Sequence, residues 1–161
     1  MSINRGKQFE DRLRKQFEKL PDTLCLRLYD VTMGYMNINN PCDLIVYRQG
    51  TLNLFELKAI HGNCLNFKSH IRPNQFESLM KYDKIPGVNA GIICWFVDLD
   101  RTVFIDGNTL SWFRDMHHLK SFNIKDRIKD LDYIEIQGKK KRTFFDYNLE
   151  NFLEAISYGE E

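Results

Sequence analysis

Asp43, Glu56 and Lys58 are the residues whose types and spacing most clearly point to chemistry. Twelve residues separate Asp43 from Glu56, and both carboxylates lie in β-rich runs joined by a short Gln-Gly turn. Side chains alternate faces along a strand, so Glu56 and Lys58 are expected on the same face. A Glu-x-Lys pair alone is more often a solvated strand end. A second carboxylate nearby instead favours a site for a hard divalent cation, Mg²⁺ or Mn²⁺.

Two further oxygen donors extend this candidate metal site. The main-chain carbonyl of Leu57 lies between Glu56 and Lys58 and is a potential ligand. Glu10 lies about 100° off the apolar stripe of the first predicted helix, so its carboxylate either leans over the site or stays a solvated helix-face residue. The predicted metal ligands are therefore Asp43, Glu56, Leu57 and Glu10.

The spacing of apolar residues predicts the elements that must position these groups. Helices are expected over 5–20 with Asn4 as the cap, from Pro73, from Asn108 and after Asn148, with a helical turn or two over 123–130. Strands are expected over 24–31, 43–48, 51–58, 90–98, 101–106, 132–137 and 143–147, a loop over 32–41, a polar connection over 59–72 and a basic turn over 138–142. This order predicts an α/β fold, a central mixed β-sheet flanked by helices, in a single domain over residues 1–161.

Composition limits the class of protein. The chain has 161 residues, of which 43% are hydrophobic, which excludes a disordered or low-complexity protein. No apolar run approaches the ~20 residues that cross a bilayer, so no membrane partner and a cytoplasmic location are expected. Four cysteines without a CxxC pair predict reduced thiols rather than a disulfide framework or a zinc ribbon.

The net charge of +1 does not by itself indicate a nucleic-acid partner. Basic residues nevertheless gather in three short segments around the acidic residues, and each such segment is by itself more often solvated surface. As a group they are candidate phosphate contacts: Arg5, Lys7, Lys68, His70, Arg72, Lys139, Lys140, Lys141 and Arg142.

The Asp, Glu-x-Lys pattern resembles that of the PD-(D/E)xK nuclease superfamily. Further blocks along the chain resemble the RecU-type Holliday junction resolvases of that superfamily. These blocks are NRGKQFE at 4–10, DLIVYRQG at 43–50, FELK at 55–58, Gln75 in its helix, GIICWF at 91–96 and FDYNL at 145–149. Cys42 replaces the family's Thr, and residues 32–41 are too few for the stalk that RecU proteins carry.

The resemblance implies a restriction-endonuclease-like core and metal-dependent cleavage of branched DNA by a homodimer. Asp43 and Glu56 would hold Mg²⁺, for which Mn²⁺ may substitute, and Lys58 would stabilise charge on the phosphoryl oxygens or orient the attacking water. Gln75 would position that water or a phosphate, unless it is an ordinary helix-surface residue. Two alternatives stay open: a restriction-like or repair nuclease acting on duplex or flap DNA, and a non-catalytic DNA-binding recombination protein of the same fold.

Overall fold

The computed structural model describes residues 4–29, 31–33, 36–38, 40–126 and 133–157. Its centre is a six-stranded sheet in which β5 and β7 are parallel and all other neighbours are antiparallel. In spatial order the strands are β1 (Thr23–Arg27), β4 (Leu44–Arg48), β5 (Thr51–Ile60), β7 (Val88–Phe96), β8 (Arg101–Asp106) and β10 (Ile134–Glu135). The predicted mixed sheet is confirmed.

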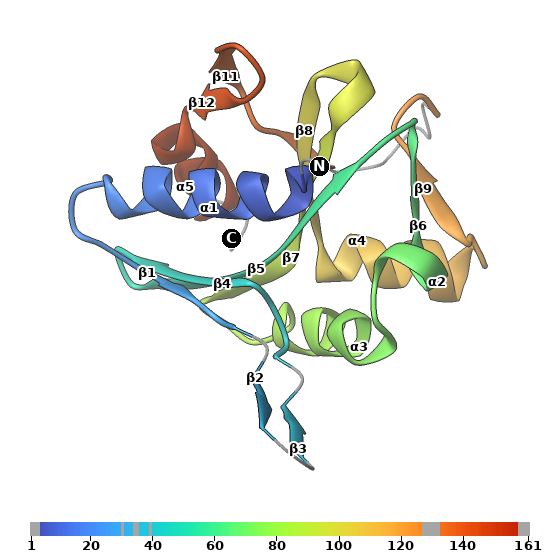
Figure 1. The fold of residues 1–161 in the computed structure, drawn as a ribbon. Coiled ribbons are helices and arrows are strands. Elements are labelled where there is room, and N and C mark those ends of the chain that lie inside the picture. Colours follow the sequence, from blue (N-terminus) through green and yellow to red (C-terminus); the bar gives the residue numbers. More distant parts are fainter. Residues whose placement is uncertain (1–3, 30, 34–35, 39, 127–132, 158–161) are drawn as a thin grey trace.

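Helices cover both faces of this sheet (Figure 1). On one face lie α1 (Arg5–Glu18) and α5 (Leu149–Ser157), and on the other lie α2 (Phe67–His70), α3 (Pro73–Tyr82) and α4 (Gly107–Ser111). The α/β architecture expected from the order of elements is therefore confirmed. No helix among the described residues is long and apolar enough to cross a membrane.

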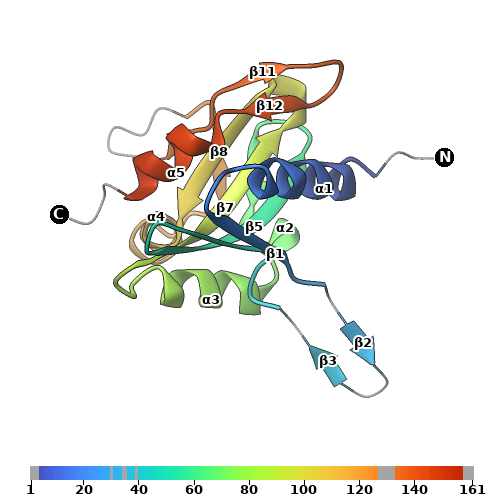
Figure 2. The same ribbon diagram turned by 90° about the vertical axis from the view of Figure 1, so that its left-hand side faces the viewer.

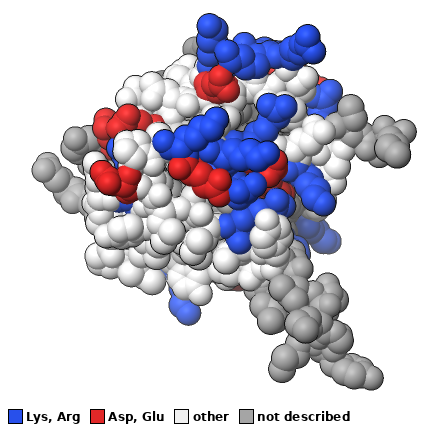
Figure 3. Space-filling view, turned by 60° about the vertical axis from the view of Figure 1, so that its left-hand side comes forward, with Lys and Arg blue, Asp and Glu red and all other residues white. Residues whose placement is uncertain are grey.

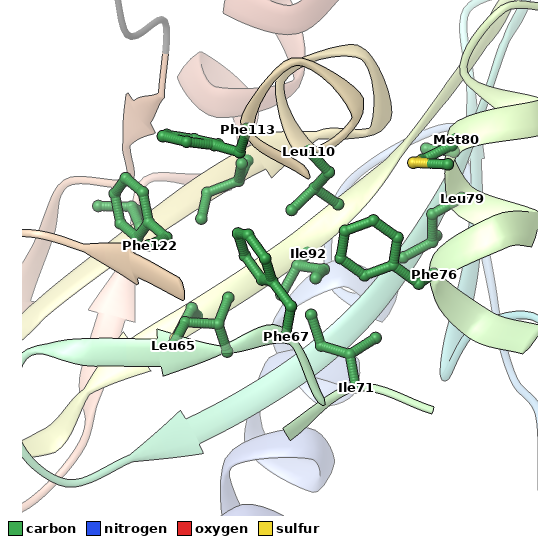
Figure 4. Packing of buried hydrophobic residues seen from close by; sticks show 14 of the residues in the cluster. Leu65, Phe67, Ile71, Phe76, Leu79, Met80, Ile92, Leu110, Phe113 and Phe122 are labelled. Carbon is green, nitrogen blue, oxygen red and sulfur yellow. The ribbon is translucent and has the colours of Figure 1, made fainter. Parts of the chain in front are cut away.

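The two faces have separate aromatic cores. Beneath α1 and α5, the ring of Phe55 lies 5.5–5.7 Å from the rings of Phe17, Phe104 and Phe152. On the opposite face, Phe67 contacts Phe76 and Phe113 in a second cluster (Figure 4). Because β5 and its neighbours are covered on both sides, their side chains are buried in alternation toward both cores.

The start of α1 and the centre of the sheet follow from local sequence. Asn4 caps α1 by accepting a 3.1 Å hydrogen bond from the backbone N–H of Lys7, as predicted. Gly91 lets β7 approach β8 closely, since a Cβ at this position would lie 2.3 Å from the carbonyl oxygen of Ile105.

The segment between β1 and β4 differs from the predicted loop. The strand expected over 24–31 ends at Arg27, and part of the predicted loop over 32–41 belongs to β2 (Val31–Met33) and β3 (Met36–Ile38), which pair antiparallel. These strands extend away from the body of the protein (Figure 2). The composition of 32–41 is typical of a loop, whereas the pairing of β2 with β3 is a main-chain interaction that composition does not report.

The predicted polar connection over 59–72 also contains regular structure. The strand expected to end at residue 58 continues to Ile60, β6 (Cys64–Asn66) pairs with β9 (Ser121–Asn123), and α2 follows. Leu65, Phe67 and Ile71 are buried there, because isolated apolar residues in a polar segment can still anchor short elements to the core. Of the 123–130 segment, in which a helical turn or two is expected, Asn123 ends β9 and residues 124–126 are not helical, while 127–130 lie outside the described residues.

The C-terminal half brings three smaller corrections. Asp106, not Asn108, caps α4 through a 2.6 Å bond from the N–H of Thr109, and a π-helical turn over Trp112–Met116 continues it. The strand predicted over 132–137 is reduced to β10 within the described residues. The predicted basic turn over 138–142 begins as a strand, β11 (Gly138–Lys140), paired with β12 (Phe145–Tyr147).

Candidate active site

Asp43 forms hydrogen bonds with Phe55 and Leu57, the residues of β5 that precede and follow Glu56. Its backbone N–H donates to the carbonyl of Phe55 at 3.0 Å, and its carboxylate Oδ2 accepts from the N–H of Leu57 at 2.8 Å. On the other side, the carbonyl of Asp43 accepts from Leu28. The hairpin expected from the sequence is thus present, and it brings the two carboxylates together.

Glu56 is the buried centre of the site, with 1% of its surface exposed. Its Oε1 forms a 2.8 Å ion pair with Nζ of Lys58, and its Oε2 accepts a 3.0 Å hydrogen bond from Nε2 of Gln75 on α3. The interpretation of Glu56 as a solvated strand end is therefore wrong. The interpretation of Gln75 as a helix-surface residue is wrong too, because Gln75 is also only 1% exposed.

The environment of Glu56 disfavours its negative charge. Burial, and next the charge of Asp43, raise the pKa of Glu56 to about 7, although Lys58 and Arg72 act in the opposite direction. The side-chain oxygen Oε1 of Gln75 is buried and has no hydrogen-bond partner among the described residues. A buried carboxylate of raised pKa beside an unsatisfied amide oxygen is an arrangement that a cation or a bound water would stabilise.

Glu10 reaches the same region from α1. Its Oε2 accepts a 2.8 Å hydrogen bond from Arg27 on β1. Burial and then the charge of Asp43 raise the pKa of Glu10, while Arg27 and Lys58 lower it. Arg27 was not predicted as a site residue. The strand register sets it opposite Leu44, next to Asp43, and no local pattern in the sequence indicates that pairing.

The donor chemistry of the site fits Mg²⁺ or Mn²⁺, because Asp43 and Glu56 offer hard carboxylate oxygens. Within residues 4–29, 40–126 and 133–157, however, no three His, Cys, Asp or Glu side chains come together as a metal-binding group. The carboxylate of Glu10 forms an ion pair with Arg27. The interaction that Leu57 makes at the site is a hydrogen bond from its N–H to Asp43, whereas its carbonyl is the predicted ligand. The metal-ligand roles of Asp43, Glu56, Leu57 and Glu10 stay predictions.

The predicted phosphate contacts fall into two groups. The first group comprises Arg5 and Lys7 on the first turns of α1, Lys68 and His70 on α2, and Arg72 at the N-cap of α3. The charge of Arg72 lowers the pKa of Glu56, so Arg72 lies close to the acidic site. Burial and then Lys58 lower the pKa of His70, whose Nδ1 accepts from the N–H of Asn66. Burial and the nearby Lys58 thus both disfavour the charged form of His70.

The second group lies on the β11–β12 hairpin and comprises Lys139, Lys140, Lys141 and Arg142. Lys140 pairs with Asp100, and Lys141 lies 3.5 Å from Asp146. Lys and Arg side chains cover this hairpin and α1 on one face of the protein, with Asp and Glu between them (Figure 3). The near-zero net charge is thus a sum of opposite charges that are unevenly distributed over the surface.

The site is therefore two carboxylates, a lysine and a buried glutamine at the end of a β-hairpin in a mixed α/β sheet. Comparison with protein-family models finds no match. Comparison with curated proteins also finds no match. Among solved structures, the fold is similar to that of Hjc, a Holliday junction resolvase from the archaeal hyperthermophile Archaeoglobus fulgidus. The two share 17% sequence identity over 65% of this chain and 78% of the other, with a TM-score of 0.47. That likeness is too distant to assign an activity to this chain.

Proposed function

We propose that this chain is a metal-dependent endonuclease of the PD-(D/E)xK type that cleaves four-way DNA junctions. The observation that carries the proposal is the contact of Lys58 with Glu56 at 2.8 Å, beside an Asp43 carboxylate anchored to Leu57. This arrangement gathers two acidic groups and a cation at one end of the hairpin. The sequence blocks that resemble RecU-type resolvases favour branched DNA as the substrate.

In this proposal Asp43 and Glu56 hold Mg²⁺, or Mn²⁺ in its place. When bound, the ion polarises the scissile phosphate and lowers the pKa of a bound water. Lys58 is 25% exposed at its side chain, so its ammonium group can neutralise negative charge on the phosphoryl oxygens. Gln75 holds one oxygen of Glu56 in place and offers its second side-chain atom, Oε1, to a water at the site.

In this proposal the chain is a single domain over 1–161, and the one such site among its described residues cuts one strand at a time. Resolution of a four-way junction requires paired cuts, and a two-fold symmetric homodimer presents two identical sites. The homodimer is therefore part of the proposal. The basic residues Arg5, Lys7, Lys68 and Arg72, with those of the β11–β12 hairpin, would contact the DNA backbone.

The test is cleavage of a synthetic four-way junction with Mg²⁺ and with EDTA. Asp43→Asn and Lys58→Ala should each reduce the cleavage rate by about a hundredfold or more while leaving junction binding intact. Asp126→Asn and Lys19→Ala, at exposed positions away from the hairpin, are the matched controls and should cleave like the parent chain. Unchanged cleavage by Asp43→Asn would refute the proposed site.

The same assay separates the alternatives when linear duplex and flap substrates of equal sequence are included. Preference for duplex or flap DNA would indicate a restriction-like or repair nuclease on the same fold. Tight junction binding without cleavage in Mg²⁺ or Mn²⁺ would indicate a non-catalytic DNA-binding protein.

A further inference from the structure

A pocket of about 460 Å³ opens beside the candidate active site, between α2, the start of α3 and the segment after the π-helical turn. Its walls are apolar and come from Phe67, Ile71, Phe76 and Leu119. Three of these residues belong to the cluster in Figure 4, where Phe67, Ile71 and Phe76 lie together on the α3 side of the sheet. The volume is within the range of pockets that bind small organic groups.

The mouth of this pocket is cationic. Lys68, Arg114 and Lys120 line it, and none of its lining residues is acidic. Lys68 and Lys120 are exposed, and neither forms an ion pair with any residue in the described part of the chain. Apolar walls beside the positive charges of Lys68 and Lys120 complement a ligand with a flat apolar body and a negative group.

Arg114 supplies a fixed planar surface to the pocket. Its guanidinium lies 4.8 Å from the centre of the Phe76 ring and is held by Glu77 at 2.6 Å and by Asp115 at 2.8 Å. Because both ion pairs restrain the guanidinium, it loses little further freedom when a ligand stacks on it. Nucleobases stack on arginine and aromatic groups of this kind with little dependence on sequence.

One short stretch of chain lines both this pocket and the acidic site. Arg72 acts electrostatically on Glu56, and Gln75 donates to Glu56. Ile71, which precedes Arg72, and Phe76, which follows Gln75, line the pocket instead. The pocket and the acidic site therefore share the segment 71–76.

We propose that the pocket holds one unpaired nucleotide of the DNA strand, with the base against the apolar walls and the face of the Arg114 guanidinium that points away from Phe76, and with the phosphate at Lys68 and Lys120. This inference rests on the proposed nuclease function and specifies how the same site recognises a branch. Nucleotides at a branch point have already lost part of their stacking and pairing, so turning one of them outward costs less there than in a regular duplex. The pocket would thus favour branched DNA over duplex DNA.

The first experiment needs no catalysis. The full chain in EDTA is titrated with deoxyadenosine monophosphate, and binding is followed by the NMR shifts of backbone amides. We expect saturable shifts around residues 66–76 and 112–120, and weaker binding of deoxyadenosine and of deoxyribose 5-phosphate, each of which lacks one half of the ligand. Absence of saturable shifts at these residues would overturn the proposal.

A matched pair of variants tests the mouth. Lys68→Ser/Lys120→Ser should weaken nucleotide binding at least about fivefold, because two phosphate contacts are lost. Lys81→Ser/Lys125→Ser removes the same charge from exposed positions outside the pocket and should bind like the parent chain. Equal binding by both double variants would overturn the proposal, and the dispersed amide spectrum of each variant shows that it is folded.

The last arm distinguishes a nucleotide within DNA from a free nucleotide. Binding of a four-way junction is measured in EDTA with intact branch-point nucleotides and with an abasic site at the branch point. The parent chain should lose several-fold in affinity with the abasic junction, and Lys68→Ser/Lys120→Ser should lose less. If the free nucleotide binds but the abasic junction binds as tightly as the intact junction, the assignment to the DNA strand is wrong.

The two proposals fail independently. Cleavage of the junction without nucleotide binding would refute the pocket alone, and nucleotide binding without cleavage would refute the nuclease function.

Discussion

Gln75 donates a 3.0 Å hydrogen bond to Glu56, although the two residues come from a helix and a strand that are separated by β6 and α2 along the chain. Both residues are 1% exposed. The contact joins α3 to the central hairpin at the point where Asp43 and Lys58 also meet Glu56. Helix α3 therefore has a structural role in the core and a positioning role at the candidate site.

The charge of Glu56 should reduce stability in the absence of divalent cations. The pKa of Glu56 is about 7 in the folded chain and near 4.5 in the unfolded chain. The free energy of unfolding therefore decreases as the pH rises from 4.5 to 7, and it stays at the lower value above pH 7. In EDTA at pH 8, Glu56→Gln should raise the free energy of unfolding by roughly 1–3 kcal/mol.

Urea unfolding at pH 5 and pH 8 measures this effect. The stabilisation by Glu56→Gln should be larger at pH 8 than at pH 5. Glu154→Gln, an exposed glutamate on α5, serves as the control and should change stability little at either pH. A stabilisation by Glu56→Gln that is independent of pH would contradict the assigned charge effect.

Removal of the Gln75 amide should affect catalysis more than binding. Gln75→Ala removes the hydrogen bond that Gln75 donates to Glu56 and keeps the ion pair with Lys58, so the carboxylate is held less firmly. We expect the single-turnover cleavage rate to fall about tenfold to a hundredfold, with junction affinity unchanged. Asn74→Ala, on the exposed side of the same helix, should cleave normally. An equal loss in both variants would indicate a defect of α3 rather than of the site.

The first turns of α1 should contribute charge to DNA binding. Arg5→Ser/Lys7→Ser should weaken binding to junction and duplex alike and lower the slope of log K against log salt by about one per lost phosphate contact. Lys19→Ser, at the opposite end of the same helix, is the control. The measurement is a set of binding isotherms at salt concentrations between about 50 and 200 mM, the range over which such slopes are measured. A slope that does not change would exclude these residues as phosphate contacts.

Phe55 should be among the most costly residues to truncate. Its ring is fully buried and contacts Phe17 of α1, Phe104 of β8 and Phe152 of α5. Phe55→Ala should lower the free energy of unfolding by about 3–5 kcal/mol, because it leaves a cavity between three elements. Tyr47→Ala, at a position 46% exposed on β4, should cost far less. Thermal or urea unfolding of both variants tests the difference.

Much of the fold was predictable from local patterns. The apolar spacing of α1, with Phe9, Leu13 and Phe17 buried, and the continuous apolar run of β7 each report which faces are covered. The hairpin of β4 and β5 followed from two β-rich runs and a short turn. Such signals are readable because helix and strand periods are properties of neighbouring residues along the chain.

The elements that were missed are short strands that depend on main-chain pairing. β6 pairs with the distant β9, and β2 pairs with β3, in each case over only three residues. Strands of that length carry no readable period, and main-chain hydrogen bonds form with little regard to side-chain type. Composition therefore predicts a loop where β2 and β3 form and a polar connection where β6 forms.

The sequence by itself determined which groups are available for chemistry: Asp43, Glu56, Lys58 and Gln75, in strands and a helix of recognisable pattern. Only the tertiary structure decided that Gln75 contacts Glu56, that Arg27 pairs with Glu10, and that Lys140 is paired with Asp100 rather than standing alone. The physical reason is that a carboxylate's charge and pKa depend on burial and on neighbours within a few ångströms, and those neighbours come from different elements. Spacing along the chain does not encode their distance.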